Sequence, residues 1–139
     1  MVQLVVGKEG KGKTKHLLDK VNEEIKKVAG NIVYLDRSTK HMFELNNKVR
    51  LINVQDYDFE NSSEFIGFIY GIISQDHDMQ QMYIDGIMKV AKLDKSDIKS
   101  MVKKLENIST TFNFDLFVSI SADVNELEEE IRKNVIVAL

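Results

Sequence analysis

The residues best suited to chemistry lie near the start of the chain, in the segment Gly7 to Thr14 (GKEGKGKT). This segment has the pattern G-x-x-x-x-G-K-T, in which two glycines frame four variable residues. Glycines let the backbone curl so that successive N–H groups point inward, where they can donate to phosphate oxygens. Lys13 then supplies a cation for the β- and γ-phosphates, and the Thr14 hydroxyl supplies a ligand for magnesium.

The elements on either side of this segment are those that such chemistry requires. Val2 to Val6 has the composition of a strand buried on both faces, and Thr14 to Val28 has apolar residues at helical spacing. The start of that helix adds the positive end of its dipole to the anion site. We expect the backbone of residues 8–11 to contact phosphate, whereas the roles of the lysine side chains around the loop stay open: Lys8, Lys11 and Lys15.

The rest of the chain alternates between strand and helix patterns. Further strands are predicted at Ile32 to Leu35, Val49 to Val54, Gln81 to Ile84, Phe114 to Ile120 and Val135 to Leu139. Further helices are predicted at Lys40 to Leu45, Ser62 to Ser74, Ile87 to Ala91, Ser96 to Ile108 and onward from Asp123. This alternation predicts one α/β domain, residues 1–139, with three α/β/α layers and a mostly parallel central sheet of five to six strands. The third strand is half polar, which favours a place towards a sheet edge.

Polar residues follow several of these strands. Ligands of parallel sheets bind at the carboxyl ends of the strands, and Gly7, Asp36, Asp85 and Ser121 fall at or just beyond such ends. Asp36 and Asp85 each follow an apolar strand and are the two candidates for holding magnesium through water. We favour Asp85 and keep Asp36 as the alternative.

The complete loop, Asp85 and the strand–helix rhythm resemble the P-loop NTPases over nearly the whole chain. With the fifth strand between the first and the fourth, the arrangement resembles small bacterial ATP-binding proteins of the additional-strand, RecA-like type. The resemblance implies that Thr14 and Asp85 hold Mg²⁺ and that Ser119 or Ser121 senses the γ-phosphate. ATP is the expected nucleotide, since the chain lacks the N-K-x-D and T-K-x-D motifs of GTPases. The implied nucleotide-binding residues are Gly7, Lys8, Glu9, Gly10, Lys11, Gly12, Lys13, Thr14 and Lys15.

The chain departs from these ATPases next to Asp85. They commonly place a glutamate there to activate the attacking water, whereas this chain has Gly86. Lys13 is therefore the one catalytic residue identified, and Glu9, Asp76 and Asp78 are weak substitutes for the missing base. Only three arginines could serve as an arginine finger, and a surface role is favoured for each: Arg37, Arg50 and Arg132. The sequence predicts an ATP-binding protein that hydrolyses ATP slowly or acts as a partner-regulated switch.

Two alternative functions remain open. Asp36 and Arg37 follow the second strand, where small-molecule and nucleotide kinases bind the phosphoryl acceptor. The chain could also be a catalytically inactive module that keeps the loop and acts through protein contacts.

Composition limits the class of partner. The net charge of −3 gives no overall attraction to nucleic acid, and four lysines at helical spacing are interpreted as a solvated face: Lys95, Lys99, Lys103 and Lys104. The absence of cysteine excludes disulfides and thiolate metal sites. No apolar run is long enough to span a membrane, so the sequence predicts a cytoplasmic protein that binds nucleotide and either a protein partner or a second copy of itself.

Overall fold

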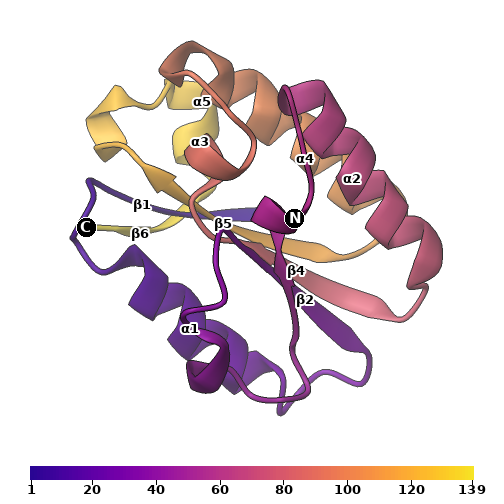
Figure 1. Cartoon of the computed structure of the whole chain (residues 1–139). Helices are drawn as coiled ribbons and strands as arrows, with labels where there is room; N and C mark the ends of the chain where they lie inside the picture. The colour runs from indigo at the N-terminus through magenta and orange to yellow at the C-terminus, as the bar shows by residue number, and fades with distance from the viewer.

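The computed structural model describes residues 1–139 as an α/β fold built on one six-stranded sheet (Figure 1). The strands are β1 (Val2–Gly7), β2 (Asn31–Asp36), β3 (Arg50–Asn53), β4 (Met79–Ile84), β5 (Asp115–Ser121) and β6 (Val135–Ala138). All strand pairs are parallel, and the order across the sheet is β3-β2-β4-β5-β1-β6. The predicted three-layer fold is therefore confirmed. The predicted place of β5 between β1 and β4, and of the third strand at an edge, is confirmed as well.

The helices cover the two faces of the sheet unequally. One face carries α1 (Lys13–Glu24), and the other carries α2 (Ser62–Gln75), α3 (Ile87–Val90), α4 (Ile98–Phe112) and α5 (Glu129–Arg132) (Figure 1). A core cluster of 29 buried residues lies under α2 to α5, and a cluster of 10 lies under α1. Alternate strand residues enter the two clusters, which is why the strands have nearly continuous apolar sequences. No helix has both the length and the apolar character needed to cross a membrane.

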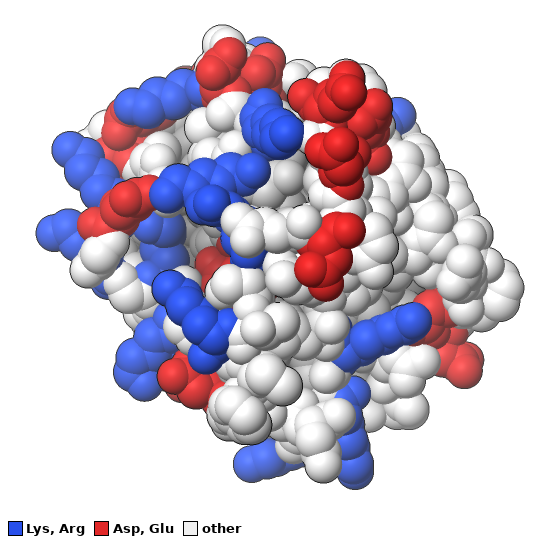
Figure 2. Space-filling model, viewed as in Figure 1, with Lys and Arg blue, Asp and Glu red and all other residues white.

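The helix α2 forms part of this core, as its apolar sequence suggests. Phe65 and Ile69 are completely buried against the sheet. The Asn61 side chain caps the helix by accepting the backbone N–H of Glu64 at 3.0 Å. The Glu64 carboxylate accepts the N–H of Glu60 instead of that of Asn61, so half of the predicted capping box is formed. Acidic side chains cluster near the start of α2, and uncharged atoms cover most of its outer side (Figure 2).

The first helix is shorter than predicted. It ends at Glu24, whereas apolar spacing predicts helix as far as Val28. The chain tightens there into i→i+3 hydrogen bonds, since the N–H of Lys26 donates to the carbonyl of Glu23. A tightened last turn is common at helix ends and is not encoded in the apolar spacing.

The helix predicted from Asp123 is replaced by two short pieces, a 3₁₀ turn (Val124–Glu126) and α5. The capping pattern itself is present, because Asp123 and Glu126 each bind the other's backbone N–H. Leu127 then adopts an extended conformation that ends the turn. The segment predicted as helix at Lys40 to Leu45 is likewise a 3₁₀ turn (Met42–Glu44), and a 3₁₀ turn (Lys95–Asp97) precedes α4.

The lysine stripe that begins in the 3₁₀ turn Lys95–Asp97 and continues along α4 is largely paired with acidic residues of the segment that follows β5. Lys95 pairs with Glu126, Lys103 pairs with Glu130, and Lys99 lies 3.1 Å from Glu130. The ammonium of Lys104 lies 6.0 Å from the centre of the Tyr70 ring. These lysines are therefore engaged in contacts within the protein surface and leave little free positive charge for a nucleic-acid backbone.

Candidate functional site

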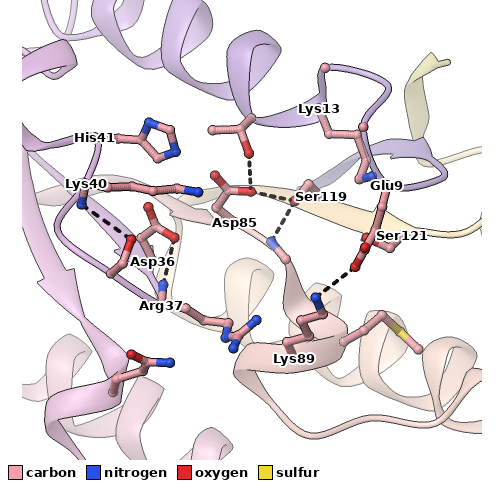
Figure 3. Close-up of a pocket in the computed structure, with 17 residues that line it drawn as sticks. Glu9, Lys13, Asp36, Arg37, Lys40, His41, Asp85, Lys89, Ser119 and Ser121 are labelled. Atoms are coloured by element: carbon pink, nitrogen blue, oxygen red, sulfur yellow. Dashed lines mark hydrogen bonds and ion pairs between the residues drawn. The ribbon is translucent and has the colours of Figure 1, made fainter.

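A polar cleft of about 780 Å³ opens at the carboxyl ends of β1, β2, β4 and β5 (Figure 3). Met88 is the one hydrophobic residue among its 17 lining residues. Ten residues singled out in the sequence line it: Glu9, Gly10, Gly12, Lys13, Thr14, Asp36, Arg37, Asp85, Ser119 and Ser121. The remaining loop residues lie outside this lining: Gly7, Lys8, Lys11 and Lys15. Lys15 instead pairs with Asp19 at 3.3 Å along the exposed side of α1.

A buried row of aromatic rings positions the polar residues of the cleft. Tyr34, Tyr83 and Phe117 are paired across neighbouring strands, with ring centroids 5.9 and 4.6 Å apart. Side chains two positions apart on a strand share a face of the sheet. Two positions after each ring, towards the carboxyl ends of the strands, lies a polar residue: Asp36 after Tyr34, Asp85 after Tyr83 and Ser119 after Phe117. The sheet register therefore brings these three polar side chains to one edge, above the aromatic row.

The Gly7–Thr14 loop leaves its backbone donors free. Gly10 and Gly12 have φ angles of 80° and 96°, a region that favours glycine, and Gly12 is the N-cap of α1. The N–H groups of Glu9, Gly10 and Gly12 have no acceptor within the protein. No side chain caps α1, and no acidic residue lies in its first turn. The loop thus presents unpaired donors and the positive end of a helix dipole to the cleft, which is an arrangement suited to an anion.

Lys13 adds a buried cation to this loop. Its side chain is 8% exposed, and its ammonium donates to the backbone carbonyl of Lys8 at 3.0 Å. Burial lowers the pKa of Lys13, while the carboxylates of Glu9 and Asp85 oppose that shift. The ammonium is therefore held at a place where a further anionic partner would stabilise its charge.

Asp85 is the centre of a hydroxyl network at the back of the cleft. Its Oδ1 accepts the Thr14 hydroxyl at 3.2 Å and the Ser119 hydroxyl at 3.0 Å, and its Oδ2 accepts the Tyr34 hydroxyl at 2.9 Å. Ser119 in turn accepts the backbone N–H of Gly86 at 2.7 Å (Figure 3). The structure thus places Asp85, and not Asp36, against the Thr14 hydroxyl. Because the Ser119 hydroxyl already donates its proton to Asp85, Ser121 is the predicted sensor serine whose hydroxyl is free to donate to a ligand.

Asp36 lies in the same cleft with half of its carboxylate unpaired. Its Oδ1 accepts the backbone N–H of Arg37 at 2.7 Å, whereas its buried Oδ2 has no hydrogen-bond partner. Burial raises the pKa of Asp36, and the Asp85 carboxylate raises it further. A buried carboxylate oxygen without a partner costs folding free energy, so the position is poorly explained by stability alone.

Three basic residues of the cleft were not identified from the sequence. Lys40, His41 and Lys89 line it together with Arg37, and Lys89 pairs with Glu9 at 2.8 Å across the mouth (Figure 3). Lys89 lies four residues after Asp85, on the short helix α3, and that spacing is the one signal that could have indicated it. The Tyr34 hydroxyl was missed too. Tyr34 and Asp36 are two positions apart on β2, and this spacing indicates that both side chains lie on the same face of the sheet.

Four other candidates from the sequence lie outside the cleft lining. Arg50 approaches Asp76 at 3.9 Å, and Arg132 donates to backbone carbonyls of Leu127 and Asn125. Asp76 and Asp78 precede β4 and therefore lie at the opposite edge of the sheet from the cleft. Arg37 is consequently the one arginine that lines this site.

The buried tyrosines predict a stability that falls in alkali. Burial raises the pKa of Tyr34 and Tyr83, and the Asp85 carboxylate raises that of Tyr34 further. Unfolded tyrosine titrates near pH 10, so above that pH the unfolded chain loses phenolic protons that the folded protein keeps. Each tyrosine should then lower the free energy of unfolding by about 1.4 kcal/mol per pH unit. Urea unfolding between about pH 9 and pH 11 measures this slope.

A variant pair provides the control for that slope. Tyr34→Phe combined with Tyr83→Phe should remove most of it, whereas Tyr57→Phe, at a position with 51% of its surface exposed, should leave it unchanged. An unaltered slope in the double variant would contradict the assignment.

Comparison with models of known protein families finds no match, and comparison with curated proteins also finds none.

Proposed function

We propose that this cleft binds a nucleoside triphosphate, with ATP as the expected one, together with Mg²⁺. One observation carries the proposal. The Gly7–Thr14 loop offers N–H groups without protein acceptors and the buried ammonium of Lys13, next to the Thr14–Asp85 pair of oxygens 3.2 Å apart. Free donors and a cation suit the phosphate chain, and the oxygen pair suits its metal.

The residues present fit magnesium. Mg²⁺ prefers hard oxygen ligands, usually one or two protein groups together with phosphate oxygens and water. Thr14 and Asp85 supply such oxygens at the same point of the cleft, and Ser119 and Tyr34 fix the Asp85 carboxylate by hydrogen bonds. A bound magnesium ion would neutralise negative charge on the β- and γ-phosphates.

The cleft offers more to the phosphates than to the base. Four cationic side chains line it, whereas Met88 is its one apolar residue and the imidazole of His41 is its one aromatic ring. Stacking and apolar contacts, which commonly hold a purine, are therefore scarce. The proposal accordingly rests on recognition of the triphosphate, and the preference for ATP over GTP rests on the family resemblance and on the absence of the GTPase motifs.

We further propose that Asp36 orients the water for a slow hydrolysis. Asp36 is the last residue of β2, and Asp85 directly follows the neighbouring strand β4. Both carboxylates line the cleft (Figure 3). The Oδ2 of Asp36 is buried without a hydrogen-bond partner, so a turn of the Asp36 side chain towards the cleft would bring this unpaired oxygen to a water molecule as the proton acceptor. Arg37 is the nearest arginine in sequence, and a protein partner or a second copy could complete the charge stabilisation. Slow turnover of this kind suits a switch, and a cytoplasmic location remains our expectation.

Asp36→Asn is expected to slow hydrolysis and to stabilise the protein. Loss of a positioned carboxylate should lower turnover by about 100-fold. Because the pKa of Asp36 is raised in the folded protein, its charge destabilises the fold at neutral pH, and this penalty disappears as the pH falls through the folded pKa. The variant should therefore unfold at higher urea concentration at pH 7, by up to about 1 kcal/mol. Phosphate release and urea unfolding measure the two effects.

Asp58→Asn, on an exposed loop, is the matched control and should change neither quantity. If Asp36→Asn stabilised the protein but left turnover unaltered, the catalytic role of Asp36 would be wrong.

Thermal and urea unfolding with added nucleotide test the binding proposal itself. A ligand at 100 times its dissociation constant stabilises a protein by about 2.7 kcal/mol. We expect MgATP to stabilise the protein to this extent, ATP in EDTA to stabilise it less, and phosphate release to be slower than about 1 s⁻¹. Absence of stabilisation by MgATP at millimolar concentration would contradict the proposal and favour an inactive interaction module.

Transfer of phosphate to a small molecule is the second candidate function. It is favoured by the width of the cleft, which extends from the loop past Asp85 to Asp36, Arg37 and Gln55. An acceptor with a hydroxyl group could bind there in place of water. A screen of metabolites and nucleotides for ADP release above the background rate tests it, and lack of stimulation by any of them would count against it.

A further inference from the structure

The Glu9–Lys89 pair is unusual for its position. Glu9 lies inside the Gly7–Thr14 loop, whose other charged residues are all lysines, and its carboxylate accepts the Lys89 ammonium at 2.8 Å. Both side chains are more than half exposed, at 67% for Glu9 and 55% for Lys89, so the pair can open without disturbing the core. Lys89 beside it holds the pKa of Glu9 below its usual range, with smaller contributions from Lys13 and Arg37.

The Glu9 carboxylate is surrounded by cations of the cleft. Lys89, Lys13 and Arg37 all act on its carboxylate, and all three line the same cavity. The Glu9 carboxylate therefore occupies the Lys89 ammonium at the mouth of the cleft while no ligand is bound.

The backbone around Gly86 brings Lys89 to this place. Gly86 has a φ of 76° and turns the chain directly from β4 into α3 after Asp85. The turn makes α3 the wall of the cleft that faces the loop, and Figure 3 shows Lys89 pointing across the mouth towards Glu9. A phosphate chain that occupies the loop and reaches Thr14 and Asp85 would extend its free end into the space between the loop and α3.

We propose that Lys89 is a ligand of the terminal phosphate and that Glu9 masks it until a triphosphate binds. This inference rests on the proposed function. A γ-phosphate carries more charge than Glu9 and displaces it from Lys89, whereas a diphosphate is too short to do so. The Glu9–Lys89 pair would thus make the site discriminate between ATP and ADP.

Calorimetry with ATP and with ADP, both with magnesium, tests the proposal on four proteins: wild type, Lys89→Met, Glu9→Gln and the double variant. Lys89→Met should weaken ATP binding by about tenfold and ADP binding by less than twofold, since a charge-assisted hydrogen bond is lost only with ATP. Glu9→Gln should tighten ATP binding several-fold. In the Lys89→Met background the same change should have a much smaller effect, because the masked cation is gone.

The possible failures are distinguishable. Binding of neither nucleotide by the wild type would overturn the proposed function. Equal weakening of ATP and ADP by Lys89→Met would overturn the role of Lys89 at the terminal phosphate. An undiminished effect of Glu9→Gln in the Lys89→Met background would show simple repulsion and overturn the masking. Lys133→Met, on an exposed residue remote from the loop in the sequence, controls for the loss of one positive charge and should leave both affinities unchanged.

Discussion

Lys13→Ala is expected to weaken binding of MgATP by about 100-fold, which corresponds to roughly 3 kcal/mol for charged hydrogen bonds to phosphate. Lys13 is the one buried cation of the loop, and its only hydrogen-bond partner in the protein is the Lys8 carbonyl. A phosphate oxygen is a stronger partner for an ammonium than a neutral carbonyl is. Calorimetry of wild type and variant with MgATP measures the loss.

The same variant should fold at least as well as the wild type. Burial lowers the pKa of Lys13, so its charged form is disfavoured in the folded state at neutral pH, and removal of that charge relieves the penalty. Lost binding together with undiminished stability would separate a functional lysine from a structural one. Lys26→Ala, an exposed change just beyond α1, is the control and should bind MgATP as the wild type does. Equal heats for Lys13→Ala and the wild type would contradict the account.

Asp85→Asn is expected to remove the dependence of ATP binding on magnesium. The substitution keeps the size of the side chain, but it removes the negative charge beside the Thr14 hydroxyl. Loss of a residue that holds or orients a metal typically costs 10–100-fold in metal affinity. The affinity of the protein for ATP is measured once with magnesium and once with EDTA. The two affinities should differ by about tenfold or more in the wild type and should be nearly equal in the variant.

Asp36→Asn is the matched comparison, since Asp36 was the alternative magnesium residue. That variant should keep the magnesium dependence, because the Thr14 hydroxyl donates to Asp85 and not to Asp36, whose Oδ1 accepts the Arg37 backbone N–H. If Asp85→Asn kept the magnesium dependence and Asp36→Asn lost it, Asp36 and not Asp85 would be the magnesium residue.

The strands and their parallel direction were predictable because their signals are local, whereas the place of β5 between β1 and β4 came with the family resemblance. Four of the six strands are short apolar runs that end at or just before a glycine, aspartate or serine, and segments with helical spacing separate most of the runs. The half-polar sequence of β3 indicated its edge position. These patterns follow from burial on one or two faces, and burial is what defines the layers of the fold.

The parts of the site that were missed depend on contacts between distant segments. Nothing in the sequence of β2 shows that the Tyr34 hydroxyl reaches Asp85, which is 51 residues away. The pairing of Glu9 with Lys89 likewise depends on the turn at Gly86. Helix ends were mispredicted at Glu24 and Leu127 because hydrogen bonds of single turns decide them, and apolar periodicity carries no information about those bonds.

A crystal structure with magnesium and a non-hydrolysable ATP analogue tests the central claim most directly. The account predicts phosphate oxygens within hydrogen-bond distance of the N–H groups of Gly10 and Gly12 and of the Lys13 ammonium. It also predicts magnesium at Thr14 and Asp85. An analogue that bound elsewhere, or that left these N–H groups without contact to phosphate at saturating concentration, would contradict it.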